Sequence, residues 1–332
     1  MPVPVLNVAA IVDLGSASAS LMVVRPGKRG RIDVVARAKA PLRLAAALDG
    51  ANRLSETAVA QTVEAMVSFA ALAASHGAER IRAVATEALR RATNGPVLCA
   101  AVRSASGIEL EVIDGEREAR LVFAGMRLEV RRGGLFGLDI GGGSTELVFG
   151  VGPAPERMIS LPFGAIETTR RLGLGDAPMS AAELATARER LDGWILPQVQ
   201  AFAPDLDLAG LSGAGRAVGT SGSVQRIARL IAAQRGQMRR SLAHVPIDAP
   251  ALAATVEALA SRSLEQRATL PGMDIERVDS LLAGALLLER IGHGLGVASW
   301  RVGMSGLRLG LCAVALGIAP DWRPPSGPGR SS

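Results

Sequence analysis

The sequence contains no tyrosine, and aromatic residues make up only 3% of its 332 positions. Proteins that bind single-stranded nucleic acid stack the bases on aromatic side chains, and such platforms are scarce here. We also find no zinc-finger or basic-helix pattern, so we expect no nucleic acid partner. Lysine is almost as rare, because Lys28 and Lys39 are the only two, and the net charge of +6 therefore comes almost wholly from arginine. Arginine matches phosphate oxygens with paired donors, which makes this charge compatible with an anionic ligand.

Residues that commonly bind transition metals are also few. Cys99 and Cys312 cannot form a disulfide framework, and they lack the clustering of a metal site. The three histidines, His76, His244 and His293, stand far apart without the spacing of metal ligands. Any metal chemistry in this protein must therefore use carboxylates.

No apolar stretch is long and uncharged enough to span a bilayer, and the N-terminus lacks the positive region of a signal peptide. We therefore expect a cytoplasmic protein with no membrane partner. The length, the hydrophobic content of 48% and the mean hydropathy of +0.27 favour a sizeable core and two domains.

One pattern occurs twice along the chain. Apolar residues 8–12 lead into Asp13-Leu14-Gly15-Ser16, after which residues 21–24 are apolar again, as in a β-hairpin with a turn of small residues. The same arrangement returns at residues 135–150, where a strand leads into Asp139 and a glycine-rich turn. Such a duplication predicts two domains of like fold that face each other across a cleft.

Between and after the hairpins, helical spacing of apolar residues is frequent. Strands are expected at 32–36, 81–86 and 109–113, and helices at 55–75, 97–105, 118–125, 180–202, 223–234, 250–263 and 277–291. We expect the chain after residue 150 to be mainly helical, with a disordered tail from Pro320 onward.

The two turns have a composition that suits phosphate. Small residues after a strand expose backbone N–H groups and hydroxyls to an anion, and Gly141-Gly142-Gly143-Ser144-Thr145 fits this strongly. A glycine-rich hairpin without any ligand is the simpler alternative, and the repeat at Asp13 weighs against it. Asp13 and Asp139 each end a buried strand, where an uncompensated carboxylate is costly unless it meets a metal, water or a donor.

Carboxylates near the second turn suit a hard cation. Mg²⁺ prefers oxygen ligands and usually retains several waters, so Asp139 and Glu146 with substrate oxygens form a sufficient set. Glu146 has an alternative interpretation as an outward charge on a half-exposed strand.

Two further side chains are candidates for the chemistry itself. Arg90 follows a buried strand and is our preferred phosphate clamp, although an exposed helix arginine has the same pattern. Glu116 and Glu118 lie at the start of a helix, where a carboxylate can orient or deprotonate water. Carboxylates also occur there simply because they complement the helix dipole.

Taken together, these residues resemble the Ppx/GppA family, which contains the exopolyphosphatases and guanosine pentaphosphate phosphohydrolases and belongs to the actin-like ATPase superfamily. The resemblance runs through most of the chain, and its motifs are residues 12–16, 85–94, 113–121, 138–147, 160–165, 219–223, 277–279, 283–285 and 306–310.

The resemblance implies an α/β fold of two ribonuclease-H-like domains, each with a mixed central sheet flanked by helices and with the active site in the interdomain cleft. It implies domain one at residues 1–130, domain two at 131–306 and a tail at 318–332. A last helix at 307–317 is expected to complete domain one.

The resemblance also implies roles for single residues. Glu118 would be the catalytic glutamate, with Arg117 in place of the glutamate that usually precedes it, and Arg90 would grip phosphate. Asp139, Glu146 and Asp13 would handle the metal, which is Mg²⁺ or Mn²⁺, with a monovalent cation as a further option. The phosphate-binding residues would be Gly15, Ser16, Ser18, Gly141, Gly142, Gly143, Ser144, Thr145 and Gly164.

Two further positions depart from the family pattern. Ala17 replaces an asparagine of the first loop, and Leu309 replaces a glutamate near the C-terminus. The chain resembles the short, two-domain members, because it ends soon after Cys312.

We expect hydrolysis of the terminal phosphoanhydride of inorganic polyphosphate, which releases orthophosphate. Removal of the 5′-phosphate of pppGpp is the alternative within the family, and a weakly catalytic sensor of polyphosphate or nucleotide is a second one. A sugar kinase is less favoured, because no sugar-binding constellation is recognised. Homodimerisation is an expectation from the family.

Overall fold

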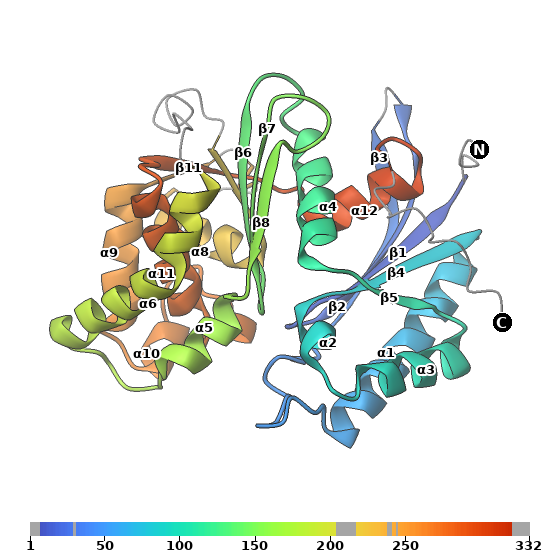
Figure 1. The fold of residues 1–332 in the computed structure, drawn as a ribbon, viewed down its shortest axis with the longest axis horizontal. Helices are drawn as coiled ribbons and strands as arrows, with labels where there is room; N and C mark the ends of the chain where they lie inside the picture. The colour runs from blue at the N-terminus through green and yellow to red at the C-terminus, as the bar shows by residue number, and fades with distance from the viewer. Residues whose placement is uncertain (1–6, 29–30, 204–216, 238–240, 244, 321–332) are drawn as a thin grey trace.

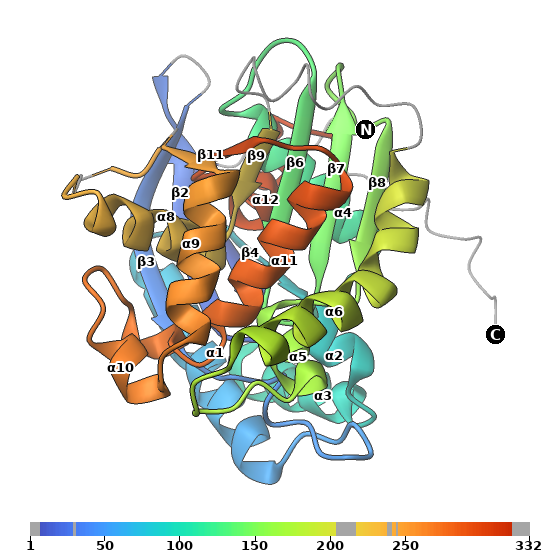
Figure 2. The same ribbon diagram turned by 90° about the vertical axis from the view of Figure 1, so that its left-hand side faces the viewer.

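From a computed structural model we describe residues 7–28, 31–203, 217–237, 241–243 and 245–320. The chain forms two α/β halves, each built on one mixed sheet (Figures 1 and 2). The expected fold class is thereby confirmed. His244 and residues 321–332 of the expected tail lie outside the described residues.

The first sheet has the strand order β3-β2-β1-β4-β5. Its strands are β1 (Ala9–Leu14), β2 (Ala19–Pro26), β3 (Ile32–Ala40), β4 (Arg80–Ala85) and β5 (Leu110–Val112). The first three strands form the antiparallel hairpins that the sequence predicts, whereas β4 and β5 run parallel to β1. Because parallel strands need crossover connections, helices lie between them in the chain.

Helices α1 (Glu56–Ser75), α2 (Glu87–Arg91) and α3 (Gly95–Ser106) accompany this sheet. The hydroxyl of Ser55 caps α1 by accepting a hydrogen bond from Ala58 N, and one apolar stripe of α1 and α3 packs into the core with β1 and β2. Among the described helices, α1 alone is long and apolar enough to cross a membrane. This is weak evidence for a span, since a core helix of this composition passes the same test.

The second sheet has the order β10-β11-β9-β6-β7-β8. Its strands are β6 (Leu135–Ile140), β7 (Thr145–Gly150), β8 (Arg157–Leu161), β9 (Ala217–Thr220), β10 (Pro246–Asp248) and β11 (Ser299–Val302). Strands β6, β7 and β8 form an antiparallel meander, and β9 and β11 continue it in parallel. The order β8-β7-β6-β9-β11 therefore repeats that of the first sheet, and β10 is an additional antiparallel edge strand.

Helices cover the second sheet and form the largest apolar core of the molecule (Figure 2). They are α5 (Ala165–Leu172), α6 (Ala181–Phe202), α8 (Gly222–Gln234), α9 (Ala249–Ala260), α10 (Leu264–Ala268) and α11 (Leu281–Gly294). Long helix α6 begins with a full capping box, in which Ser180 and Glu183 satisfy each other's backbone donors.

Two helices fill the space between the sheets, α4 (Gly115–Arg127) and α12 (Leu307–Ala315) (Figure 1). Phe123 and Met126 of α4 pack against the second sheet, whereas Leu121 joins α12 on the free face of the first sheet. The helices approach so closely that a Cβ at Gly125 or Gly310 would collide with the backbone of the other helix. The last helix thus packs on β1, nearly the full length of the chain away.

The second half contains more strand than the sequence led us to expect. Strands β9, β10 and β11 have only three or four residues each, too few for an alternating pattern to stand out from the helices around them. The helix expected at 277–291 begins at Leu281, because the short 3₁₀ turn Ile275–Arg277 precedes it.

Candidate functional site

Four carboxylates gather where the two halves of the molecule meet. Asp13 and Asp139 lie near the ends of the equivalent strands β1 and β6. Glu146 stands directly opposite Asp139 in the β6–β7 ladder, and Glu118 lies in the first turn of α4. The charges of Asp13 and Asp139 raise the pKa of Glu118, and those of Glu118 and Asp139 raise the pKa of Glu146. The four carboxyls therefore share one electrostatic environment. The structure therefore brings together the predicted base and all three predicted metal-binding carboxylates.

Glu118 is almost completely buried, at 6% exposure. The pKa of its carboxyl is raised to about 7, mainly by burial and also by the negative charges of Asp13 and Asp139, while Arg90 opposes the shift. Arg90 Nη1 donates to Glu118 Oε2 at 2.8 Å. This carboxyl is thus held in place with a pKa near neutrality, which suits a group that takes up a proton.

The other three carboxyls have raised pKa values as well. Burial raises the pKa of Asp139 to about 6, with a further contribution from Asp13, and Arg308 opposes both shifts. Burial also raises the pKa of Asp13, again against the Arg308 charge. The pKa of Glu146 lies well above its ordinary value because of burial and the charges of Glu118 and Asp139. An added cation would therefore favour the ionised forms of these carboxyls.

The chemistry of these donors fits a hard divalent cation, because every acidic side chain offers oxygen. Within the described residues, however, no three His, Cys, Asp or Glu side chains form a ready-made metal cage. Mg²⁺ commonly binds one or two carboxylates and completes its shell with water and phosphate oxygens. The predicted metal site therefore stays a prediction that the donor set supports.

The two turns have the same internal structure and touch each other. Gly15 N donates to Ser18 O at 3.1 Å, and Gly141 N donates to Ser144 O at 2.9 Å. A Cβ placed on Gly143 would lie 2.5 Å from the Ser16 hydroxyl oxygen, so a larger residue there would force a neighbouring side chain to move. Each turn is therefore shaped partly by the other.

Several backbone donors of these turns remain available. Within the described part of the chain, the N–H groups of Ser16, Ala17, Gly142 and Gly143 have no hydrogen-bond acceptor. Neighbouring N–H groups in a turn form a concave site that favours an anion. This arrangement supports the sequence prediction for the turns.

Two of the predicted phosphate-binding residues have structural partners instead. Gly164 N donates to Gly143 O at 3.0 Å, and the hydroxyl of Thr145 is fully buried and donates to Phe163 O at 2.6 Å. Both residues support the second turn from beneath. Because both donors are used in this way, neither is free for the direct phosphate contact that the sequence predicts.

Arg90 is engaged on several sides. Besides Glu118, its guanidinium donates to Ile113 O at 2.8 Å and to Glu87 Oε2 at 3.0 Å. A guanidinium held in this way orients the carboxyl of Glu118. A phosphate clamp, as the sequence predicts, would have to share these donors with the substrate.

Two contributors to the site were missed at the sequence level. Arg308 faces Asp13 and Asp139, and Glu87 anchors Arg90. Both lie inside motifs that carry the family resemblance, so the signal was present without an assigned role. Of the two glutamates of α4, Glu116 is exposed and pairs with Arg120, whereas Glu118 is buried and pairs with Arg90.

A duplicated sheet order with paired turns and carboxylates at the junction is the arrangement of a two-domain, actin-like fold. Residues 22–316 match the Ppx/GppA phosphatase family, and this chain belongs to that family. It is 32% identical to exopolyphosphatase 1 of Mycobacterium tuberculosis over 315 residues, which cover 91% of this chain and 86% of the relative. Exopolyphosphatase 1 of Mycobacterium leprae is also 32% identical, with 91% and 87% covered.

Solved structures agree with the fold. A crystal structure of an exopolyphosphatase from Cytophaga hutchinsonii superposes with a TM-score of 0.81 at 20% identity, covering 94% of this chain and 98% of that one. The Ppx/GppA family member of Aquifex aeolicus gives a TM-score of 0.76 at 23% identity, with the same coverage. The two-domain actin-like fold expected from the sequence is therefore confirmed.

Proposed function

We propose that this protein is an exopolyphosphatase, which hydrolyses the terminal phosphoanhydride bond of inorganic polyphosphate and releases orthophosphate. The observation that carries the proposal is the position of Glu118, a buried carboxyl with a pKa of about 7 that faces Asp13 and Asp139 beside two turns with free N–H donors. Relatives named exopolyphosphatase 1, 32% identical over most of the chain, support the same activity.

In the proposed reaction, the ionised Glu118 orients a water molecule and accepts its proton as the oxygen attacks the terminal phosphorus. Hydrogen bonds from Arg90 hold this carboxyl in place and favour its ionised form. The free N–H groups of the turns stabilise the charge on the transferred phosphoryl oxygens, as preorganised donors do in phosphoryl transfer. No covalent intermediate is required.

We further propose that Asp139, Glu146 and Asp13 hold Mg²⁺, which would neutralise phosphate charge in the cleft. Mn²⁺ has the same preference for oxygen and is the alternative metal. A monovalent cation, a homodimer and a cytoplasmic location stay predictions.

The function is tested by measuring phosphate release from polyphosphate, pppGpp and ATP side by side, with and without Mg²⁺. We expect polyphosphate to be the preferred substrate and chelation of the metal to abolish turnover. If pppGpp were hydrolysed far faster than polyphosphate of any length, the protein would instead be a guanosine pentaphosphate phosphohydrolase. If polyphosphate bound tightly but was never hydrolysed, a sensor would be the better description.

A further inference from the structure

A buried glutamate joins the two halves of the molecule close to the candidate site. Glu167 belongs to the first turn of α5 in the second half, and it is only 2% exposed. Its Oε2 accepts a hydrogen bond of 2.7 Å from Arg91 Nη1, and Arg91 is the last residue of α2 in the first half. The residue before it, Arg90, holds Glu118. The Arg91–Glu167 pair therefore lies one residue from the group that orients the proposed base.

The carboxylate of Glu167 is ionised, and both of its oxygens are bonded. Burial opposes ionisation, but hydrogen bonds from Arg170, Arg171 and Arg91 outweigh it and lower the pKa to about 2. Arg170 and Arg171 lie on α5 itself, so of these three cations only Arg91 connects the carboxylate to the other half. Asn52 Oδ1 also accepts a hydrogen bond from Arg91 Nη2, at 3.1 Å. The pair is thus a well-fixed, charge-assisted contact at neutral pH.

The backbone around Glu167 supports the second turn. Ala165 N donates to Gly141 O at 2.9 Å, and the N–H groups of Ile166 and Glu167 donate to Gly142 O at 2.9 and 3.2 Å. N–H groups at the start of a helix have no partner inside that helix, so they are available for such contacts. The start of α5 therefore fixes the carbonyls of the second turn, and Glu167 connects this turn through its side chain to α2.

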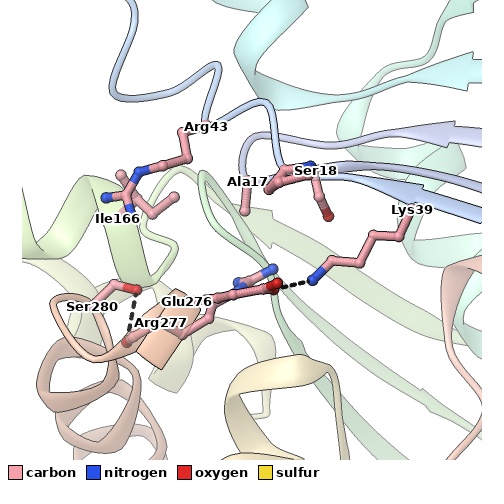
Figure 3. A pocket seen from close by; sticks show the side chains of 9 residues that line it. Ala17, Ser18, Lys39, Arg43, Ile166, Glu276, Arg277 and Ser280 are labelled. Atoms are coloured by element: carbon pink, nitrogen blue, oxygen red, sulfur yellow. Dashed lines mark hydrogen bonds and ion pairs between the residues drawn. The ribbon is translucent and has the colours of Figure 1, made fainter. Parts of the chain in front are cut away.

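Elsewhere the two halves are held less firmly. A cavity of about 160 Å³ lies between them, and its lining includes Ile166 from one side and the ion pair Lys39–Glu276 (Figure 3). The side chains of that pair are 40% and 56% exposed, whereas those of Arg91 and Glu167 are 26% and 2% exposed. Exposed ion pairs are screened by water and constrain a structure little. The Arg91–Glu167 pair therefore constrains the junction more than the pair at the cavity.

We propose that Glu167 is a positioning residue for the reaction. Through Arg91 it holds helix α2, and with it the Arg90–Glu118 pair, at a fixed place relative to the second turn. This inference rests on the proposed hydrolytic function. Glu118 has to place water in line with a phosphorus that the second turn binds, and these groups come from different halves. A displacement of about 1 Å between reacting groups can lower a rate about a hundredfold, so a fixed junction favours turnover.

The first test compares Glu167→Gln with a matched control, Glu289→Gln. Glu289 accepts two hydrogen bonds from Arg188, at 2.8 and 2.7 Å, but this pair joins α11 to α6 within the second half. We expect Glu167→Gln to lower kcat about tenfold and to change KM for polyphosphate less than about twofold, because the N–H groups of the turn are retained. The control should keep kcat within about twofold while its Tm falls.

A purely structural role for Glu167 gives a different result. Both variants would then have a lower Tm and an unchanged kcat, and this outcome would overturn the proposal. If Glu167→Gln does not fold, Arg91→Gln provides the same comparison, because it leaves the carboxylate bonded to the two arginines of α5.

Variants of the arginine partners show whether the effect crosses the halves. Arg91→Gln breaks the contact with α2, whereas Arg170→Gln removes a partner on α5 itself. We expect kcat to fall about tenfold in the first and less than about twofold in the second. The double variant Arg91→Gln/Glu167→Gln should lose no more than the larger single loss, because both changes remove one interaction. Equal losses in the two arginine variants, or multiplied losses in the double variant, would contradict the proposal.

Hydrogen exchange of backbone amides tests the same coupling without turnover. Mass spectrometry follows peptides 86–92 and 164–170 in the unchanged protein, in Arg91→Gln and in Arg170→Gln. Arg91→Gln should increase exchange in both peptides, and Arg170→Gln in 164–170 alone. An increase confined to 86–92 in Arg91→Gln would overturn the inference even if polyphosphate is hydrolysed. The expected pattern in a protein that does not hydrolyse polyphosphate would overturn the proposed function alone, and the kcat ratios would then be measured with pppGpp or ATP.

Discussion

The two hairpins share one plan and differ in charge. In the first, Asp13 stands opposite Ser20, and in the second, Asp139 stands opposite Glu146 at the equivalent ladder position. Ser20 accepts a hydrogen bond from Arg308 at 3.1 Å, whereas Glu146 adds a second acidic group to the cleft. The first hairpin therefore has one carboxylate at this position of the ladder, and the second has two.

Their turns differ as well. The second turn has three consecutive glycines, where the first has Gly15-Ser16-Ala17. Gly143 lies against Ser16 of the opposite turn and also against Glu87, which holds Arg90. We infer that the second hairpin provides most of the binding of metal and transferred phosphate. The first half contributes the opposite turn, Gly15-Ser16-Ala17, and Arg90.

The largest expected effect concerns the group that serves both hairpins. Glu118→Gln should lower kcat about a thousandfold, since it removes the proton acceptor, while polyphosphate binding is retained. Rapid-mixing assays of phosphate release and equilibrium titration measure the two quantities. Glu116→Gln in the same helical turn is the matched control, because this side chain is 64% exposed and pairs with Arg120. Unchanged turnover in Glu118→Gln would exclude its role.

Equivalent positions of the hairpins provide the next test. Glu146→Gln is expected to lower kcat about a hundredfold and to raise the Mg²⁺ concentration needed for half-maximal rate. Ser20→Ala should cost less than about fivefold, since it removes only a hydroxyl that Arg308 contacts. Equal losses in both variants would show that the hairpins share the metal evenly.

The turns are compared through Gly143 and Ala17. Gly143→Ala places a methyl group 2.5 Å from the Ser16 hydroxyl and 2.8 Å from Glu87 Cγ, so one of them must move. We expect about a tenfold loss of kcat/KM and a destabilisation of about 1–3 kcal/mol in urea unfolding. Ala17→Gly lacks this collision and should change activity less than about threefold. A larger loss of activity in Ala17→Gly than in Gly143→Ala would place the critical phosphate contacts in the first turn.

The smallest effect concerns stability without metal. The pKa of Asp139 is raised from 3.8 to about 6 in the folded protein, so its favourable contribution exists below pH 3.8 and is lost as pH rises through 6. Asp139→Asn should therefore raise Tm by about 2–4 °C at pH 8, by about half as much at pH 5, and by little below pH 3.8. Scanning calorimetry in a chelator measures this. With Mg²⁺ added, the unchanged protein should gain more stability than the variant, and a Tm independent of pH would contradict the assigned cause.

Much of the architecture could be predicted from local pattern. The hairpins, helix α1, helix α6 and the strand at Arg80–Ala85 all lie within a few residues of their expected positions, because long periodic segments carry their own signal. The short strands β9 and β11 could not be recognised, since four residues show no period and pairing with a distant strand decides their structure.

The candidate site, like the fold, has some features that the local sequence predicts and others that it does not. The local sequence places carboxylates and small residues at the ends of the duplicated strands, and it therefore predicts the carboxylates and turns of the cleft. The sharing of Arg90 between Glu87 and Glu118, and the support of a turn by Gly164 and Thr145, depend on how distant segments pack. This packing also brought Arg308 from the last helix to Asp13, and Arg43 to the first turn. The physical reason is that hydrogen bonds and charge pairs depend on distances across the fold, which no local pattern encodes.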